Sequence, residues 1–201
     1  MWTQSQSTQD EAGSKRWEAT AAELVKQIEN EHSPYWARRS EALLASRLSV
    51  GSGSSDVDLK TRAAQGLYRS GQWQDAVAAY ESAAVAARDA GRADQAFDLD
   101  YTAAAILHEK NEHLQAATKY RRLALASAEH PQAPQAHILA VFHAGQALKA
   151  NQLKLEDFSQ LVHEHLQRWP NAVTAAHAHI YAGNLHLHAR DWPAAVKEYA
   201  A

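Results

Sequence analysis

Histidine is the residue type in this sequence with the clearest potential for chemistry. Eleven of the twelve histidines lie between His108 and His188, and three pairs have the spacing His-x-His, at 163/165, 177/179 and 186/188. Neutral imidazole is a common metal ligand, and it gains a proton near pH 6.5. The pattern therefore raises two hypotheses, a metal site and a region whose charge responds to pH.

Helical geometry argues against the metal site. Residues two apart on a helix point to opposite sides, so no His-x-His pair can share one ion. His179 and His186 share a side but lie about 10 Å apart along the axis. Only a pair on two helices, such as His143 with His177, could meet the distances that zinc requires. We predict solvated or hydrogen-bonded histidines and no cofactor; a pH response stays open, with no bistable element visible in the sequence.

Other catalytic patterns are missing from the sequence. It has no cysteine, and its serines form no Gly-x-Ser-x-Gly elbow. The segment "GSGSS" lacks the lysine that a phosphate-binding loop requires. Glu156 and Asp157 beside Lys154 are typical of the first turn of a helix, where carboxylates face exposed amides. The sequence therefore predicts a protein that is not an enzyme.

Composition predicts an all-α fold. Apolar residues make up 46% of the 201 residues, alanine is abundant, and there are only eight glycines and five prolines. The net charge of -3 gives no basic field for a phosphate backbone, so we predict no nucleic-acid partner. No run of about 18 apolar residues occurs, so we predict no membrane insertion in this segment. The compartment stays open between cytoplasm and bacterial periplasm.

The chain divides at a Gly/Ser-rich connector, residues 49–56. Residues 1–13 are polar and predict a disordered lead, and residues 14–48 predict an N-terminal helix pair. That pair is either a degenerate capping repeat or a separate hairpin. Residues 57–201 predict four helical hairpins, with helices at 57–70 and 73–90, 93–110 and 112–129, 132–150 and 155–168, and 171–189 and 192 onward.

The four hairpins repeat one order of residues. Their first helices carry Ala64, Ala104, Gly145 and Gly183, at steps of 40, 41 and 38. A small residue there lets the second helix approach closely, and a large residue one turn after the second helix's small residue fills the space beside it. The second helices carry the pairs Ala76 and Tyr80, Ala116 and Tyr120, Phe158 and Val162, and Ala195 and Tyr199.

This order resembles the tetratricopeptide repeat (TPR) family. The segments "LYRSGQWQDAVAAYESA" and "AGNLHLHARDWPAAVKEYA" match its pattern well, and the two middle hairpins match less closely. The spacing exceeds the family's usual 34 residues, which implies longer helices. The segment "RWPNAVTAAHAHIYAGNLH" also looks like the longer repeats of bacterial envelope scaffolds. The resemblance implies a right-handed α-solenoid whose last repeat, ending in mid-pattern, is truncated.

The resemblance also implies a function, that of a non-catalytic scaffold for protein–protein interaction. Its concave groove, lined by first helices, would hold a peptide or protein partner, with exposed aromatics as anchors unless they seal neighbouring repeats. The alternatives are a self-associating assembly subunit, which would be a homo-oligomer, and the regulatory part of a larger enzyme. The predicted partner-binding residues are Arg62, Gln65, Tyr68, Arg69, Tyr101, His108, Phe142, His143, Gln146, Lys149, His177, Tyr181, Asn184 and His188.

Overall fold

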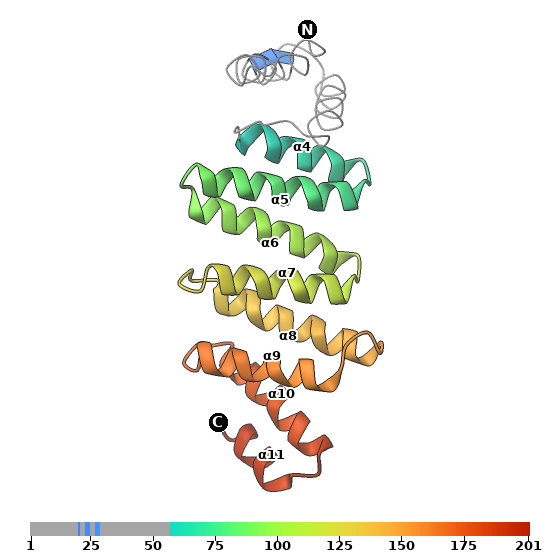
Figure 1. The fold of residues 1–201 in the computed structure, drawn as a ribbon, viewed down its shortest axis with the longest axis vertical. Coiled ribbons are helices and arrows are strands. Elements are labelled where there is room, and N and C mark those ends of the chain that lie inside the picture. Colours follow the sequence, from blue (N-terminus) through green and yellow to red (C-terminus); the bar gives the residue numbers. More distant parts are fainter. Residues whose placement is uncertain (1–19, 21–22, 25–26, 29–56) are drawn as a thin grey trace. The chain divides into compact units, whose positions relative to one another are not determined.

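The computed structural model describes residues 20, 23–24, 27–28 and 57–201, and these residues form helices and no strand. Most of the predicted N-terminal helix pair, and all of residues 1–13 and 49–56, lie outside the described residues. Eight helices follow one another along residues 57–201 (Figure 1). They are α4 (Val57–Arg69), α5 (Trp73–Asp89), α6 (Ala93–Glu109), α7 (His113–Ala126), α8 (Ala133–Lys149), α9 (Leu155–Arg168), α10 (Ala175–His188) and α11 (Trp192–Tyr199).

Contacts divide the chain into two compact units. Met1–Ile106 forms the first unit and Leu107–Ala201 the second. The first unit holds α4, α5 and most of α6; the second holds the end of α6 and α7 to α11. Every helix start and end lies within four residues of its predicted position. The predicted all-α fold of TPR-like hairpins is confirmed at this level, with each unit considered by itself.

Five of the described helices, α4, α5, α6, α8 and α10, end just before a residue with left-handed backbone. Gly71 and Gly91 have φ of 83° and 72°, and Asn111, Asn151 and Arg190 have φ of 59°, 57° and 62°. At each position two amides return to carbonyls of the last helical turn, as when Gly71 donates to Tyr68 and Gln72 to Leu67, both at 3.0 Å. This closure satisfies carbonyls that the helix leaves open. It fixes short connections that reverse the chain between neighbouring helices.

Small residues set the contact between the helices of a hairpin. Ala64 and Ala76 in the first hairpin have no exposed surface. In the third and fourth hairpins the small residue of the first helix is a glycine, Gly145 or Gly183. An aromatic ring of the second helix lies where the side chain of a larger residue would be. A methyl group on Gly145 would lie 3.4 Å from the Phe158 ring, and one on Gly183 would overlap the ring of Tyr199. Phe158, which departs from the repeat pattern, is thus matched by a smaller partner.

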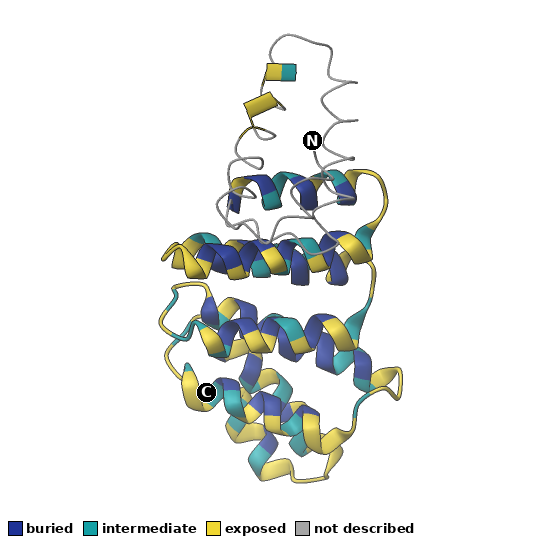
Figure 2. Cartoon of the chain, turned by 45° about the horizontal axis from the view of Figure 1, so that its top comes forward, coloured by how far each residue is buried: buried dark blue, intermediate teal, exposed yellow. Residues whose placement is uncertain are grey.

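Large side chains at the predicted core positions are buried within their units. Tyr80 and Tyr120 are 7% and 2% exposed, and Phe158 and Val162 are also buried. Buried positions recur along the helices at the helical period (Figure 2). Tyr199 differs: it occupies the same repeat position on α11 but is 48% exposed.

The burial of Tyr120 generates a stability prediction. Tyr120→Ala should lower the free energy of unfolding by about 3–5 kcal/mol, because the ring is enclosed and stacks on His143 with centroids 6.0 Å apart. Tyr199→Ala, at the equivalent exposed position, should cost about 1 kcal/mol. Urea unfolding of both variants measures the difference, and equal losses would contradict the packing described here.

Candidate functional site

The predicted first-helix residues divide by burial. Five are half-buried: Arg62, Tyr68, Tyr101, Gln146 and Tyr181. Eight are exposed: Gln65 and Arg69 in the first unit, and His108, Phe142, Lys149, His177, Asn184 and His188 in the second unit.

Three of the predicted binding residues, Tyr101, Tyr181 and Asn184, contact side chains of the unit to which they belong. Tyr101 stacks on Phe97 at 6.2 Å between centroids, and Tyr181 meets Phe158 edge-on at 5.9 Å. Asn184 accepts a hydrogen bond of 2.7 Å from the Tyr199 hydroxyl. These contacts favour a packing role for the two tyrosines. The binding role of the fourteen residues stays a prediction.

His143 is the exception among the predicted surface residues, and its assignment to an accessible face is wrong. Its imidazole has no exposed surface, because it lies between two other histidines. His143 Nε2 is 2.7 Å from His108 Nδ1, and His143 Nδ1 is 3.0 Å from His113 Nδ1. The partners are thus His108 and His113, not His177. Within the described residues, no group of three or more His, Asp or Glu is arranged to hold a metal ion.

A second histidine chain runs through the interior of the second unit. His137 Nε2 lies 3.0 Å from Glu164 Oε2, and the Nδ1 atoms of His137 and His165 are 3.2 Å apart. His165 Nε2 lies 3.0 Å from the hydroxyl of Thr174, the residue immediately before α10. Arg121 completes the chain, since its Nε and Nη2 donate to the two Glu164 oxygens at 2.7 and 3.1 Å.

Glu164 fixes the direction of every proton in this chain. The hydrogen bonds from Arg121, more than the one from His137, lower the pKa of Glu164, so its carboxylate only accepts. His137 must therefore donate through Nε2, which leaves its Nδ1 to accept from Nδ1–H of His165. The remaining His165 nitrogen, Nε2, accepts from the Thr174 hydroxyl. Every ring nitrogen is satisfied with both imidazoles neutral.

Burial keeps these imidazoles neutral. It is the main cause that lowers the pKa of His165 to about 4, with His137 as a second cause. Burial followed by the nearness of His108 and His113 lowers the pKa of His143 to about 4. Burial also lowers the pKa of His137, although Glu164 opposes that shift. The three buried imidazoles of His137, His143 and His165 are therefore neutral near neutral pH.

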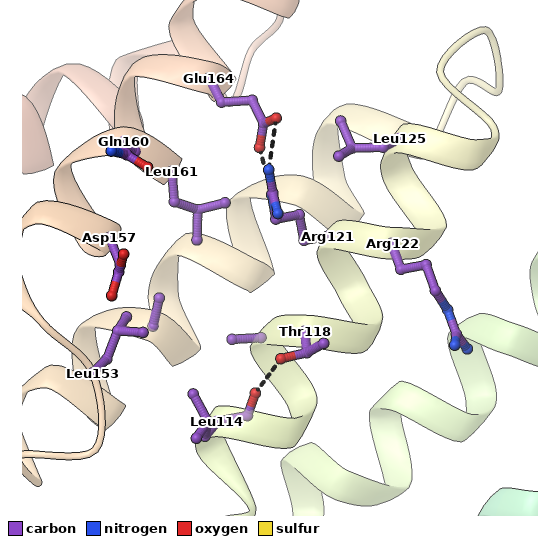
Figure 3. A pocket seen from close by; sticks show the side chains of 12 residues that line it. Leu114, Thr118, Arg121, Arg122, Leu125, Leu153, Asp157, Gln160, Leu161 and Glu164 are labelled. Atoms are coloured by element: carbon purple, nitrogen blue, oxygen red, sulfur yellow. Dashed lines mark hydrogen bonds and ion pairs between the residues drawn. The ribbon is translucent and has the colours of Figure 1, made fainter.

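An open groove lies between α7 and α9. Most of its lining residues lie on α7 and α9 (Figure 3), and its volume is about 690 Å³. Two buried alanines, Ala117 and Ala144, also line it. We call this the α7–α9 groove. Its lining residues are Leu114, Ala117, Thr118, Arg121, Arg122, Leu125, Ala144, Leu153, Asp157, Gln160, Leu161 and Glu164.

Three polar side chains of the α7–α9 groove, those of Arg121, Glu164 and Thr118, make hydrogen bonds within the protein. Arg121 and Glu164 bridge the two walls, as the dashed lines of Figure 3 show. Thr118 donates its hydroxyl proton to the Leu114 carbonyl at 2.9 Å. Between these contacts four leucines line the hollow, and Leu114 is 39% exposed. The site can therefore accept apolar side chains without first breaking a hydrogen bond.

The sequence contains a signal for this groove that the repeat pattern hides. Leu114, Thr118, Arg121 and Leu125 recur at steps of four, three and four, which places them on one side of α7. Ala116, Tyr120 and Leu123 form the buried stripe. A helix with two such stripes can contact its own hairpin with one stripe and a further surface with the other. The binding residues predicted from the sequence all lie on the first helices of the hairpins. The groove instead lies between second helices.

The buried histidines generate a prediction about stability and pH. Above pH 6.5 both folded and unfolded chains hold His143 and His165 neutral; between pH 6.5 and about 4 only the unfolded chain takes up their protons. The free energy of unfolding should therefore fall as the pH drops through this window, by at most about 3 kcal/mol for each residue. Urea unfolding at several pH values measures the slope.

Two variants test the assignment of that slope. His143→Leu should make the dependence on pH shallower, because its buried imidazole no longer titrates differently in the two states. His188→Gln is the matched control, since His188 is exposed on α10. An unchanged slope in His143→Leu would show that His143 is not held neutral by burial.

None of the described helices is both long and apolar enough to cross a membrane. No protein-family model matches the sequence, and no curated protein matches it. The solved structures that resemble the fold include two of MamA. One is MamA 41-end from Desulfovibrio magneticus RS-1, at 14% identity and a TM-score of 0.47 over 91% of each chain. The other is a double mutant of MamA RS-1, at 16% identity and 0.48, over 91% of this chain and 90% of the other.

Proposed function

We propose that this chain is a non-catalytic interaction module that holds a segment of another protein in the α7–α9 groove. The observation that carries the proposal is the groove itself, an open hollow of about 690 Å³ with four leucines in its lining. Water-exposed apolar surface gathered in a concave site with a charged rim is typical of binding surfaces. The first-helix face predicted from the sequence is the alternative location.

The arrangement of titratable groups supports binding over catalysis. A general base must accept a proton from a bound substrate, at hydrogen-bond distance from it. Glu164, the most buried carboxylate of the groove, already accepts from Arg121 and His137. His137 and His165 lie beneath the surface with both nitrogens engaged. These groups organise the groove wall and leave its apolar part to make the contacts.

A peptide library tests the function and its location together. Peptides of 16 residues displayed on phage and selected against the wild-type chain should include binders that fail on Leu114→Glu, which places a charge in the groove. The loss should be at least tenfold in Kd. The same peptides should bind Phe142→Ala normally, since Phe142 lies on the first-helix face.

Two outcomes of this selection would contradict the proposed location. Binders lost on Phe142→Ala or Tyr101→Ala but kept on Leu114→Glu would move the site to the first helices. Binders insensitive to all three variants would contradict both locations. Circular dichroism of each variant confirms that its helices are retained.

Self-association is a second candidate function, favoured by the exposed side chains of α11. Trp192, Val196 and Tyr199 occur at helical spacing and are 59%, 67% and 48% exposed. At the repeat positions equivalent to Val196, Val77 and Ala117 are only 7% and 6% exposed. The surface that is buried at these positions in the other hairpins is thus exposed on α11. The same surface of a second copy of this chain could cover it.

Sedimentation equilibrium tests this candidate. If α11 self-associates, the average mass of the wild type should rise with protein concentration, and Val196→Glu should abolish the rise because it places a charge in the apolar contact. Val173→Glu is the matched control, because Val173 is 92% exposed outside the helices. A wild-type chain that stays monomeric over the whole range would dismiss the candidate.

A further inference from the structure

We propose that the segment held in the α7–α9 groove is an amphipathic α-helix of the partner protein, with an acidic edge toward α7 and a basic edge toward α9. This inference rests on the proposed function and specifies the conformation, the chemistry and the direction of what is bound. It follows from three features of the groove: its hydrogen-bonding capacity, its length and the charge of its two walls.

The hydrogen-bonding capacity of the groove favours a helix over an extended segment. A bound strand needs partners for its own amides and carbonyls, and sheet edges normally supply them. Both walls here are helices, whose backbone groups are bonded internally. Among the side chains, Arg121 and Glu164 bond each other and Thr118 bonds the Leu114 carbonyl. Asp157 and Gln160, both on α9, are too few to satisfy the backbone of a bound strand. A helix satisfies its own backbone and brings only side chains to the groove.

The length of the groove matches about three helical turns. Its lining on α7 runs from Leu114 to Leu125, a span of eleven residue steps that rises by about 16 Å. A partner helix of that length presents apolar side chains at i, i+3 or i+4, and i+7. Two lining residues are buried alanines, Ala117 and Ala144, whose small side chains leave space between the leucines for such side chains to enter.

The walls differ in charge. The charged lining residues on α7 are Arg121 and Arg122, whereas those on α9 are Asp157 and Glu164. The ion pair between Arg121 and Glu164 partly neutralises one charge on each wall, but α7 keeps a positive sign and α9 a negative one. The lining is neutral in sum, so apolar contacts supply most of the affinity, and charge selects the orientation. A helix lying on its apolar face has one edge toward each wall. Opposite charges on those edges therefore fix which end of the helix lies near Leu114.

The probe that tests the inference is a synthetic 18-residue peptide. It carries leucines at i, i+3, i+4 and i+7, glutamates along one edge, lysines along the other and a nitroxide at its N-terminus. Two matched peptides accompany it: one with a central proline that breaks the helix, and one with glutamates and lysines exchanged. Fluorescence titration gives Kd, and nitroxide broadening of amide resonances reports direction.

The helical probe should bind the wild-type chain at least tenfold more tightly than the proline peptide. Leu114→Glu should weaken it at least tenfold. Thr118→Trp, which fills the hollow from an exposed position, should do the same and guards against misfolding of the first variant. The two edge arrangements should bind in opposite directions, one broadening resonances near Leu114 and the other near Leu125.

Each contrary result overturns a defined part of the inference. Equal binding of the proline peptide would show that the occupant is not a helix, while library peptides lost on Leu114→Glu would still support the proposed function. Broadening at the same end for both edge arrangements would overturn the assignment of charge. If no peptide binds and a fluorescent fatty acid does, in a manner lost in Thr118→Trp, the groove belongs to a small apolar ligand and both proposals fail.

Discussion

Glu164 on α9 is the point at which the second unit is tied together. It accepts from Arg121 on α7 and from His137 on α8, and through His137 it connects to His165 and then to Thr174 at the start of α10. Four consecutive helices therefore share one hydrogen-bonded chain. Because its middle members are buried, each bond must be made, since an unsatisfied polar group there is costly.

Because Glu164 is ionised, the hydrogen bonds of this chain can run in only one direction. If the carboxyl group were protonated, His137 could donate or accept, and two opposite arrangements of protons would compete. The Arg121 guanidinium removes that choice by lowering the pKa of Glu164. In the other cluster, His143 lies between two histidines that can each donate or accept, so no charged group selects one direction.

The same ion pair connects the interior to the surface. Arg121 and Glu164 belong to the lining of the α7–α9 groove, while His137 holds Glu164 from the buried side. One wall of the groove is thus fixed before anything binds. Preformed sites lose less conformational entropy on association than mobile ones, so this ion pair would favour the binding that we propose for the groove.

The sequence by itself determined the helices, their ends and the stripes that hold each hairpin together. These are local properties: the helical period brings Ala76 and Tyr80 to one side, and residues such as Gly71 and Asn111 end helices by adopting positive φ. In the third hairpin the repeat pattern has a glycine, Gly145, on the first helix and a large residue, Phe158, on the second. The structure shows that the Phe158 ring lies against Gly145.

Only the tertiary structure decided which side chains meet and which face is hollowed. His143 stands at a surface position of the repeat pattern, yet partners 35 and 30 residues away enclose it. Glu164 and Arg121 are 43 residues apart in sequence. The groove depends on the distance between α7 and α9, and that distance is set by the side chains packed between them. Periodicity along one helix carries no information about it, because each helix specifies its own stripe and not the spacing of its neighbours.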